Sequence, residues 1–350
     1  MINVAIMGYG VVGSGVAELL DSNSNLFEEK LGQPVQVKYI LDIRDFVNDK
    51  YQEKLIKDFN TIVTDNDIQV VVETIGGTKV PYEYTLACLK AGKHVITSNK
   101  ELVSIYGAEL CKIAKENHVN YLFEAAVGGG IPILHPILNC LNANKITKIV
   151  GILNGTTNYI LTKMIHENTD FETALKEAQK LGYAEADPSA DIEGKDTSRK
   201  ICILSALAFG KYISPDKIET IGIQNLTLED IKQADRQGKV IKLLGVASKE
   251  NDDTIHIFVS PCAIDKKHFL ANIKDVYNGI IVTGDAVGDT VFIGKGAGKF
   301  PTASAVCSNI IEAIQTKEST SSNWNETNKI KTLHDLNLDC IEKTHIPILD

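Results

Sequence analysis

Short apolar runs of strand length alternate with longer stretches of helical periodicity over the first 123 residues. The runs that predict strands lie at 2–7, 35–41, 68–74, 93–97 and 119–123. Helices are expected at 11–21, 81–92 and 101–116, and the polar stretch 22–34 is expected to be a loop. Strands that alternate with helices of this length predict an α/β fold with a doubly wound parallel sheet.

The pattern changes after about Ile131, where strands come in pairs with no helix between them. The predicted pairs are 239–249 with 254–260, and 278–284 with 289–294. Long helical segments are expected at 155–181, 193–209 and 300–316, and the polar stretch 318–328 is expected to be mobile. This part of the chain therefore predicts a second, α+β domain with a mixed or antiparallel sheet.

Composition narrows the classes of function that fit the chain. With 44% apolar and 23% charged residues, the 350-residue chain suits two globular domains. A net charge of −9 without a long basic run argues against a nucleic-acid partner. Seven scattered cysteines without a C-x-x-C pair favour a reducing compartment over a disulfide framework. The sequence has neither a leader pattern nor a membrane-length apolar run, so the expected location is the cytoplasm, with no membrane partner.

The first predicted strand ends in a complete G-x-G-x-x-G pattern that opens the following helix. This context is typical of a Rossmann domain: the glycines permit a tight turn, close approach to a pyrophosphate, and close packing of helix on sheet. Free N–H groups at the helix N-terminus also favour phosphate. The alternative is a glycine-rich turn that binds no ligand. The expected cofactor-binding residues in this loop are Gly8, Gly10, Val11, Val12 and Gly13.

Asp42 and Arg44 follow the second predicted strand, where the ribose of a dinucleotide is expected. A carboxylate there suits the 2′-hydroxyl of NAD, whereas a guanidinium suits the 2′-phosphate of NADP, so both cofactors remain open. The alternative is that these side chains are simply solvated. Loops after the third and fourth strands should lie at the same sheet edge, and they add to the expected cofactor site Thr74, Gly76, Ser98 and Lys100.

The densest group of charged residues lies between Gly182 and Lys200. Pro188 interrupts an acidic loop, and Asp196 and Lys200, four residues apart on a predicted helix, share one face. Clustered carboxylates suit the ammonium group of an amino-acid substrate, and a lysine suits the negative charge that develops on a carbonyl receiving hydride. The alternative is a solvated loop with a surface ion pair worth about 0.3–0.5 kcal/mol.

Seven segments, in order along the chain, resemble the homoserine dehydrogenase family. They are GYGVVGSG at 8–15, VVVETIGG at 70–77, GKHVITSNKELVS at 92–104, EAAVGGGIPIL at 124–134, GILNGTTNYIL at 151–161, GYAEADPSADIEGKDTSRK at 182–200 and GKGAGKFPTASAV at 294–306. The resemblance implies NAD(P)-dependent, reversible reduction of L-aspartate 4-semialdehyde to L-homoserine, on the route to threonine and methionine. The rival hypotheses are another amino-acid dehydrogenase, such as one acting on aspartate, and a non-catalytic dinucleotide-sensing protein.

The resemblance also implies roles for individual residues. Lys200, Asp196 and Lys100 would serve direct hydride transfer as catalytic residues, by orienting substrate and supplying charge and a proton. The residues implied in substrate binding are Glu185, Asp191, Tyr183 and Thr156. The resemblance also implies a site for a monovalent cation, Na⁺ or K⁺, in the segment that begins at Glu124. The alternative is that this segment is only a flexible turn. The implied ligands of the cation are the backbone carbonyls of Val127, Gly129 and Ile131, with the Glu124 carboxylate nearby.

The same resemblance implies a discontinuous dinucleotide-binding domain of residues 1–131 and 290–318. Residues 132–289 would form the substrate-binding, catalytic and dimerisation domain of a homodimer or tetramer. The tail 319–350 is expected to be too short for the regulatory ACT domain that many bacterial relatives carry.

Overall fold

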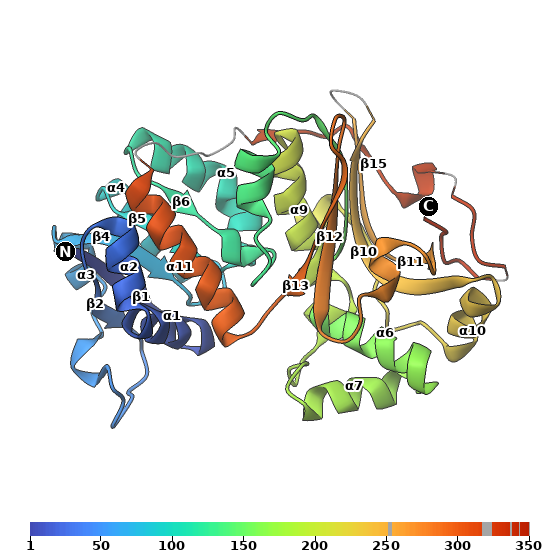
Figure 1. The fold of residues 1–350 in the computed structure, drawn as a ribbon, viewed down its shortest axis with the longest axis horizontal. Coiled ribbons are helices and arrows are strands. Elements are labelled where there is room, and N and C mark those ends of the chain that lie inside the picture. The colour runs from blue at the N-terminus through green and yellow to red at the C-terminus, as the bar shows by residue number, and fades with distance from the viewer. Residues whose placement is uncertain (251–253, 317–323, 337, 343, 350) are drawn as a thin grey trace. The chain divides into compact units, whose positions relative to one another are not determined.

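The computed structural model describes residues 1–350 except 251–253, 317–323, 337, 343 and 350 (Figure 1). The chain divides into two compact units, which are described separately below. The first unit consists of Met1–His135 and Ala297–Asn323, and the second of Pro136–Gly296 and Trp324–Asp350. Part of the polar stretch that we expect to be mobile, residues 318–323, lies outside the described residues.

The first unit is built on a parallel sheet with strand order β3-β2-β1-β4-β5-β6. The strands are β1 (Ile2–Met7), β2 (Val35–Leu41), β3 (Leu55–Ile56), β4 (Ile68–Glu73), β5 (His94–Thr97) and β6 (Tyr121–Leu122). This order joins two mononucleotide-binding halves, and it reverses direction between β1 and β4, which is where such folds bind dinucleotides. The predicted doubly wound α/β fold is therefore confirmed.

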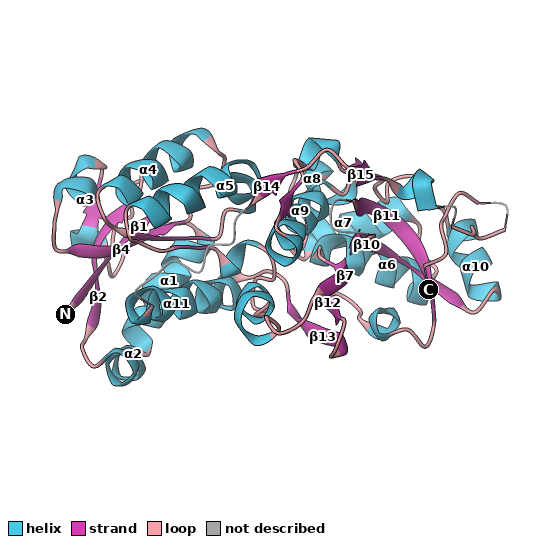
Figure 2. Cartoon of the chain, turned by 90° about the horizontal axis from the view of Figure 1, so that it is seen from above, coloured by secondary structure: helices cyan, strands magenta, loops and turns pink. Residues whose placement is uncertain are grey.

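Helices cover both faces of this sheet. They are α1 (Val11–Ser22), α2 (Ser24–Leu31), α3 (Asn60–Thr64), α4 (Lys79–Lys90), α5 (Lys100–Glu116) and α11 (Lys299–Gln315). Figure 2 shows α4 and α5 together on one face, and α1 beside α11 on the other. The prediction of a loop over 22–34 is wrong, because α2 occupies most of it. Phe27 and Leu31 pack on the core one turn apart, and Gly32 ends the helix in a left-handed conformation with φ 70°.

The core of the first unit joins segments that are far apart in sequence. Strands β1 and β4 contribute apolar side chains to it, and α11 contributes Ala303, Val306 and Ile310 from near the end of the chain. A Cβ atom on Gly15 of α1 would lie 3.1 Å from the Cβ of Ala303, so this glycine permits close packing of the two helices. The first unit is therefore incomplete without α11.

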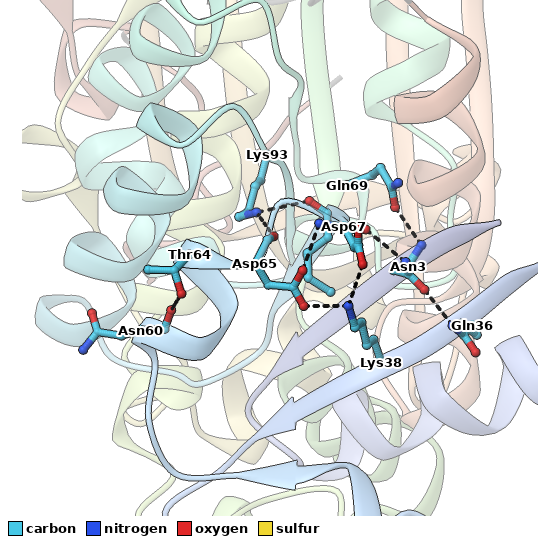
Figure 3. Close-up of polar contacts among 10 residues, drawn as sticks. Asn3, Gln36, Lys38, Asn60, Thr64, Asp65, Asp67, Gln69 and Lys93 are labelled. Carbon is cyan, nitrogen blue, oxygen red and sulfur yellow. Dashed lines mark hydrogen bonds and ion pairs between the residues drawn. The ribbon is translucent and has the colours of Figure 1, made fainter.

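A polar network holds the amino ends of these strands, at the edge opposite the glycine loop (Figure 3). The Lys38 ammonium lies 2.7 Å from Asp65 and 3.2 Å from Asp67. The Nζ atom of buried Lys93 donates to the carbonyl oxygen of Asp65 at 2.6 Å. The network links β2 to the loops that precede β4 and β5, so it serves the structure of the sheet.

The second unit is built on a seven-stranded sheet with the path β13-β12-β7-β10-β11-β15, and β9 also pairs with β11. The strands are β7 (Ile146–Ile152), β9 (Glu219–Thr220), β10 (Lys239–Lys249), β11 (Ile255–Asp265), β12 (Tyr277–Gly284), β13 (Gly288–Lys295) and β15 (Ile330–Lys331). Most neighbours are antiparallel, but β9 and β15 run parallel to β11, which confirms the mixed sheet. A separate pair joins β8 (Lys211–Tyr212) to β14 (Asn325–Glu326).

The point at which the chain returns to the first unit differs from our expectation. We expect residues 290–318 to belong to the nucleotide-binding domain, but β13 pairs with β12 along its whole length. Residues 290–295 therefore belong to the second sheet, and the return begins at Ala297.

The helices of the second unit are α6 (Gly155–Glu167), α7 (Phe171–Lys180), α8 (Ser189–Ile192), α9 (Lys195–Phe209) and α10 (Leu228–Arg236). The single helix predicted over 155–181 is wrong: Asn168, with φ 52°, ends α6, and the side chain of Asp170 caps α7. Helices α6, α9 and α10 pack on β10. Among the described residues, no helix is long and apolar enough to cross a membrane.

Candidate active site

The glycine loop has the geometry that its spacing predicts. Gly8 has φ 92°, and a Cβ atom there would lie 2.7 Å from the carbonyl oxygen of Thr74. A Cβ on Gly13 would lie 2.0 Å from the carbonyl oxygen of Gly8, whereas one on Gly10 would meet no atom within 4 Å. Gly10 caps α1 without a side-chain hydrogen bond, and Val11 at the first helical position is 66% exposed. The open side of the loop therefore presents helix N–H groups, as a pyrophosphate site requires.

Asp42 and Arg44 form an ion pair at the end of β2. The buried Asp42 carboxylate accepts hydrogen bonds from the Tyr9 amide at 2.7 Å and from the Arg44 Nη2 atom at 2.8 Å. The Arg44 guanidinium, helped by the backbone donors of Arg44 and Tyr9, holds the pKa of this carboxyl well below its usual range, although burial acts in the opposite direction. Arg44 is itself mostly exposed and lies over the ring of Phe46. Asp42 therefore fixes the glycine loop, and the accessible charge at this end is that of Arg44.

A buried carboxylate that sequence reasoning missed links the next two loops. Glu73 ends β4 and accepts hydrogen bonds from the Ile75 amide and the Thr97 hydroxyl. Burial raises the pKa of Glu73. The only signal in the sequence was an acid inside the apolar run that forms β4. Glu73 connects the carboxyl ends of β4 and β5, where the expected cofactor residues Thr74, Gly76 and Ser98 lie.

Lys100 is the first residue of α5 and is half-buried. Asn99 caps this helix by accepting from the Leu102 amide at 3.0 Å, and it donates to the carbonyl oxygen of Gly77 at 2.7 Å. The loop after β4 and the start of α5 are therefore tied together. All of the expected cofactor residues lie in the first unit: on the loop after β1 and the first turn of α1, at the carboxyl ends of β2, β4 and β5, or at the start of α5.

The second unit brings a lysine and an aspartate together below the protein surface. The Lys200 Nζ atom lies 2.8 Å from the Asp196 Oδ2 atom on the next turn of α9, with side chains only 8% and 5% exposed. The ammonium also donates to the carbonyl oxygen of Leu153 at 2.7 Å. The contact implied by the four-residue spacing is present. Because the pair is buried, the alternative of an ordinary surface ion pair is wrong.

Asn154 connects this pair to a second carboxylate, a contact that sequence reasoning missed. Its Nδ2 atom donates to Asp191 at 2.7 Å and to Asp196 at 2.9 Å, and its Oδ1 atom caps α6 by accepting from the Thr157 amide. Burial, followed by the charge of Asp196, raises the pKa of Asp191. An asparagine before the G-T-T sequence was visible as a helix cap, but its long-range partners were not.

The remaining expected substrate residues lie around this group. The Thr156 hydroxyl donates to the carbonyl oxygen of Tyr183 at 2.7 Å, and the ring of Tyr183, 44% exposed, lies 5.0 Å from that of Tyr159. Glu185 is exposed, and its carboxylate makes no hydrogen bond or ion pair with the part of the chain that the structure describes. The structure thus gathers Lys200, Asp196, Asp191 and Thr156, and leaves the Glu185 carboxylate in solvent.

The segment at Glu124 has a different chemistry from that of a carboxylate metal site. Both Glu124 oxygens accept backbone hydrogen bonds, from Ile133 at 2.6 Å, Leu134 at 2.8 Å and His135 at 2.7 Å. Burial raises the pKa of Glu124. Within the described residues no group of three or more His, Cys, Asp or Glu side chains could hold a metal ion.

A parallel sheet of this strand order, with this glycine loop at its reversal point, places the chain in the class of dinucleotide-dependent oxidoreductases. Two family models match it: "Homoserine dehydrogenase, NAD binding domain" over residues 8–124 and "Homoserine dehydrogenase" over residues 132–311. The chain belongs to the homoserine dehydrogenase family.

Individual relatives agree with this assignment. The homoserine dehydrogenase of Bacillus subtilis is 40% identical over 318 residues, which cover 90% of this chain and 73% of the relative. The enzyme of Synechocystis is 43% identical over 320 residues, covering 89% and 73%. The crystal structure of a homoserine dehydrogenase from Thiobacillus denitrificans matches with a TM-score of 0.87 and 36% identity, covering 99% of this chain and 79% of that one. A hyperthermophilic archaeal homoserine dehydrogenase in complex with NADPH matches with a TM-score of 0.75 and 27% identity, covering 90% and 98%.

The chain is accordingly an NAD(P)-dependent oxidoreductase that interconverts L-aspartate 4-semialdehyde and L-homoserine. This result decides against both rival classes, a dehydrogenase for another amino acid and a non-catalytic sensor.

Proposed function

We propose that Lys200 donates the proton to the alkoxide that forms when the aldehyde is reduced, with Asp196 as its positioning residue. The observation that carries this proposal is the buried Lys200 ammonium, held between the Asp196 carboxylate and the Leu153 carbonyl oxygen. The nicotinamide supplies the hydride when the cofactor is bound. An ammonium fixed by two acceptors loses little freedom when an oxyanion forms beside it, so its charge stabilises that oxyanion. In the oxidative direction the neutral amine accepts the hydroxyl proton.

The substrate ammonium is assigned to the carboxylates near the start of α9. Asp191 is held by Asn154 rather than by a cation, so its negative charge remains available to a ligand. Glu185 supplies a second, exposed carboxylate. Thr156 ties the first turn of α6 to the Tyr183 loop, which would keep these acids in place.

The cofactor is assigned to the first unit. Its pyrophosphate would bind at Gly8–Gly13, and the loops that carry Thr74, Gly76, Ser98 and Lys100 would lie beside the nicotinamide. The exposed guanidinium of Arg44 suits a 2′-phosphate, so NADP is assigned as a substrate along with NAD.

A monovalent cation fits the backbone of the segment after Glu124. The carbonyl oxygens of Val127, Gly129 and Ile131 accept no hydrogen bond from the described residues, and these three residues are buried. Neutral oxygens without a hydrogen-bond partner suit Na⁺ or K⁺, whereas Glu124 would act only by fixing the backbone.

The second unit is assigned to substrate binding and catalysis and also to homodimer formation. Strand β13 ends its sheet and pairs with β12 alone among the described residues. Val287 beside it and Ile293 on it are 49% and 57% exposed. An open strand edge with exposed apolar side chains suits a second copy of the chain.

The role of Lys200 is tested with Lys200→Ala and a matched control, Lys195→Ala. Lys195 lies on the same helix, is 61% exposed and pairs with Glu193. We expect Lys200→Ala to lower kcat for semialdehyde reduction by about 100-fold or more, since general acid catalysis typically contributes this much. The control should keep its kcat. Both variants should bind NADP and NAD as the unchanged chain does, measured by fluorescence titration alongside the spectrophotometric assay. A folded Lys200→Ala variant with nearly normal kcat would remove Lys200 from the mechanism.

A further inference from the structure

A cavity lined by charged side chains lies in the second unit, away from the lysine–aspartate group. Its volume is about 370 Å³, and its walls come from the end of α6, from α10, from the start of β10 and from residues 266–274. The charged side chains that line it are Lys232, Lys239, Lys242, Lys266, Lys274, His166 and Asp235. Five lysines against a single carboxylate are notable in a chain of net charge −9. We call this site the lysine cavity.

The innermost of these lysines is firmly built into the fold. Lys242 is 2% exposed, and its Nζ atom donates to the Asn158 Oδ1 atom at 3.0 Å and to the carbonyl oxygen of Ile273 at 2.5 Å. Both acceptors are neutral, and no carboxylate of the described residues forms an ion pair with this ammonium. Burial, followed by the charge of Lys274, lowers the pKa of Lys242 to about 8. Burial of the charged Lys242 ammonium lowers the stability of the fold, and an anion bound in the cavity would offset that loss.

Most of the outer lysines are not neutralised by an ion pair within the described residues. Lys266 is paired with Asp235 at 2.6 Å, but Lys232, Lys239 and Lys274 make no ion pair within the described residues. The carboxylate whose charge acts on Lys242 is that of Asp275, which does not line the cavity. Burial is the main cause that lowers the pKa of both Lys242 and His166; the charge of Lys274 lowers both further, and that of Asp275 opposes it. These groups therefore repel one another across the cavity, and that repulsion is relieved when an anion binds.

The type of cationic side chain that lines the cavity indicates which class of anion it binds. The cavity is lined by lysine and histidine and by no arginine. Arginine presents a planar fork to carboxylates and phosphates alike, whereas lysine binds an anion as a point charge. A cavity lined by lysines therefore favours a ligand with dense negative charge, and a phosphate group carries close to two charges where a carboxylate carries one. The volume lies at the lower end of the range for small-molecule sites, so the ligand must be small.

We propose that the lysine cavity binds a small phosphate-bearing metabolite. The site is separate from the substrate site, because it lies at the carboxyl end of α6 and the Asn154–Thr156 contacts lie at the amino end. Helix α6 connects the two, and Asn158 in its first turn accepts a hydrogen bond from Lys242. The proposal does not depend on the roles assigned to Lys200 and its neighbours.

The test is calorimetric titration of the full chain with inorganic pyrophosphate. Saturating NADP is present throughout, so that the glycine loop is filled. We expect binding in the micromolar to submillimolar range in the unchanged chain. The double variant Lys239→Ala, Lys274→Ala should bind at least tenfold more weakly. The control double variant, Lys90→Ala, Lys176→Ala, removes two exposed lysines outside the cavity and should bind as the unchanged chain does. Citrate at equal concentration should bind at least several-fold more weakly than pyrophosphate.

Three outcomes would overturn the proposal: no heat beyond that of potassium chloride at equal ionic strength, equal weakening in both double variants, or citrate binding as tight as pyrophosphate. If the cavity variant does not fold, the proposal is tested on the unchanged chain by lysine acetylation. Acetylation of lysines, followed by mass spectrometry, should show that pyrophosphate protects Lys239 and Lys274 but not Lys90 and Lys176. Equal protection of all four would also overturn it.

Discussion

At the scale of single residues, the negative charge that lets Asp191 bind the substrate ammonium lowers the stability of the folded chain. The residue lies among buried groups, and its pKa is raised by that burial and by Asp196. A raised pKa means that the folded chain binds a proton at a pH where the unfolded chain has released it. Stability is therefore lost as the pH rises through the unfolded and then the folded pKa, and the ionised carboxylate costs the fold free energy at neutral pH.

We predict that Asp191→Asn separates these two effects. The amide keeps an oxygen to accept from Asn154 but carries no charge. The variant should unfold at a higher temperature than the unchanged chain at pH 8, and this difference should shrink as the pH falls toward 4, where the aspartate itself becomes protonated. Its KM for homoserine should rise about tenfold or more because the substrate ammonium loses its partner. Differential scanning calorimetry at several pH values and steady-state kinetics measure both effects. An equal or lower melting temperature at pH 8 would contradict this account.

The sequence predicts residue contacts best where both partners lie on one element. The spacing of Asp196 and Lys200 predicted a shared helix face, and the structure has that contact. The partners of Asn154 lie 37 and 42 residues away, and no local pattern predicts such a contact. Glu73 was missed because a buried acid in an apolar strand is stabilised by donors from neighbouring loops.

At the scale of elements, α6 carries a cap that serves two purposes. Asn154 satisfies a free N–H group of the first turn and also holds two carboxylates, whereas Asp170 caps the next helix, α7, without such contacts. The two caps therefore form a natural pair for comparison.

We predict that Asp170→Ala lowers stability by about 1 kcal/mol, the usual cost of a lost helix cap, and that Asn154→Ala lowers it more, because Asp191 and Asp196 also lose their amide donor. Only Asn154→Ala should also lower kcat/KM, by about tenfold or more, since Asp191 and Asp196 lose the amide that fixes them. Urea unfolding and steady-state kinetics on both variants test this. An equal loss of kcat/KM in both variants would mean that the effect comes from stability alone.

The predicted helices and strands agree with the structure where the hydrophobic periodicity of the sequence is strong. The main alternation of strands and helices in the first unit was predicted, but the short elements β3 and α3 were missed, as was α2, whose mean hydropathy is low and whose apolar contacts are few. The break between α6 and α7 was missed because it needs only an asparagine in the left-handed region and a capping aspartate. Strand β7 was not predicted, although it lies at the centre of the second sheet.

At the scale of the whole molecule, the chain leaves the first unit and returns to it for α11. Ile310 of that helix is fully buried in the core that β1 and β4 share. The integrity of the nucleotide-binding unit thus depends on residues near the other end of the sequence.

We predict that Ile310→Ala destabilises the first unit by about 2–5 kcal/mol, the usual cost of such a truncation in a core. Hydrogen exchange should quicken in β1 and β4 and stay unchanged in β10 and β11. The matched variant Ile264→Ala, in the core of the second unit, should show the reverse pattern. Quickened exchange in both units from either variant would show that they unfold as one cooperative whole.

The late position of α11 also has a consequence for synthesis on the ribosome. The six strands of the first sheet have all been synthesised once Leu122 has been added, yet the helix that closes one face begins only at Lys299. At roughly 5–20 residues per second, a nascent chain spends some ten seconds or more with that face uncovered. Chaperones that bind exposed apolar surface would have this interval in which to act, and a chain that ends before α11 would be an unclosed, aggregation-prone fragment.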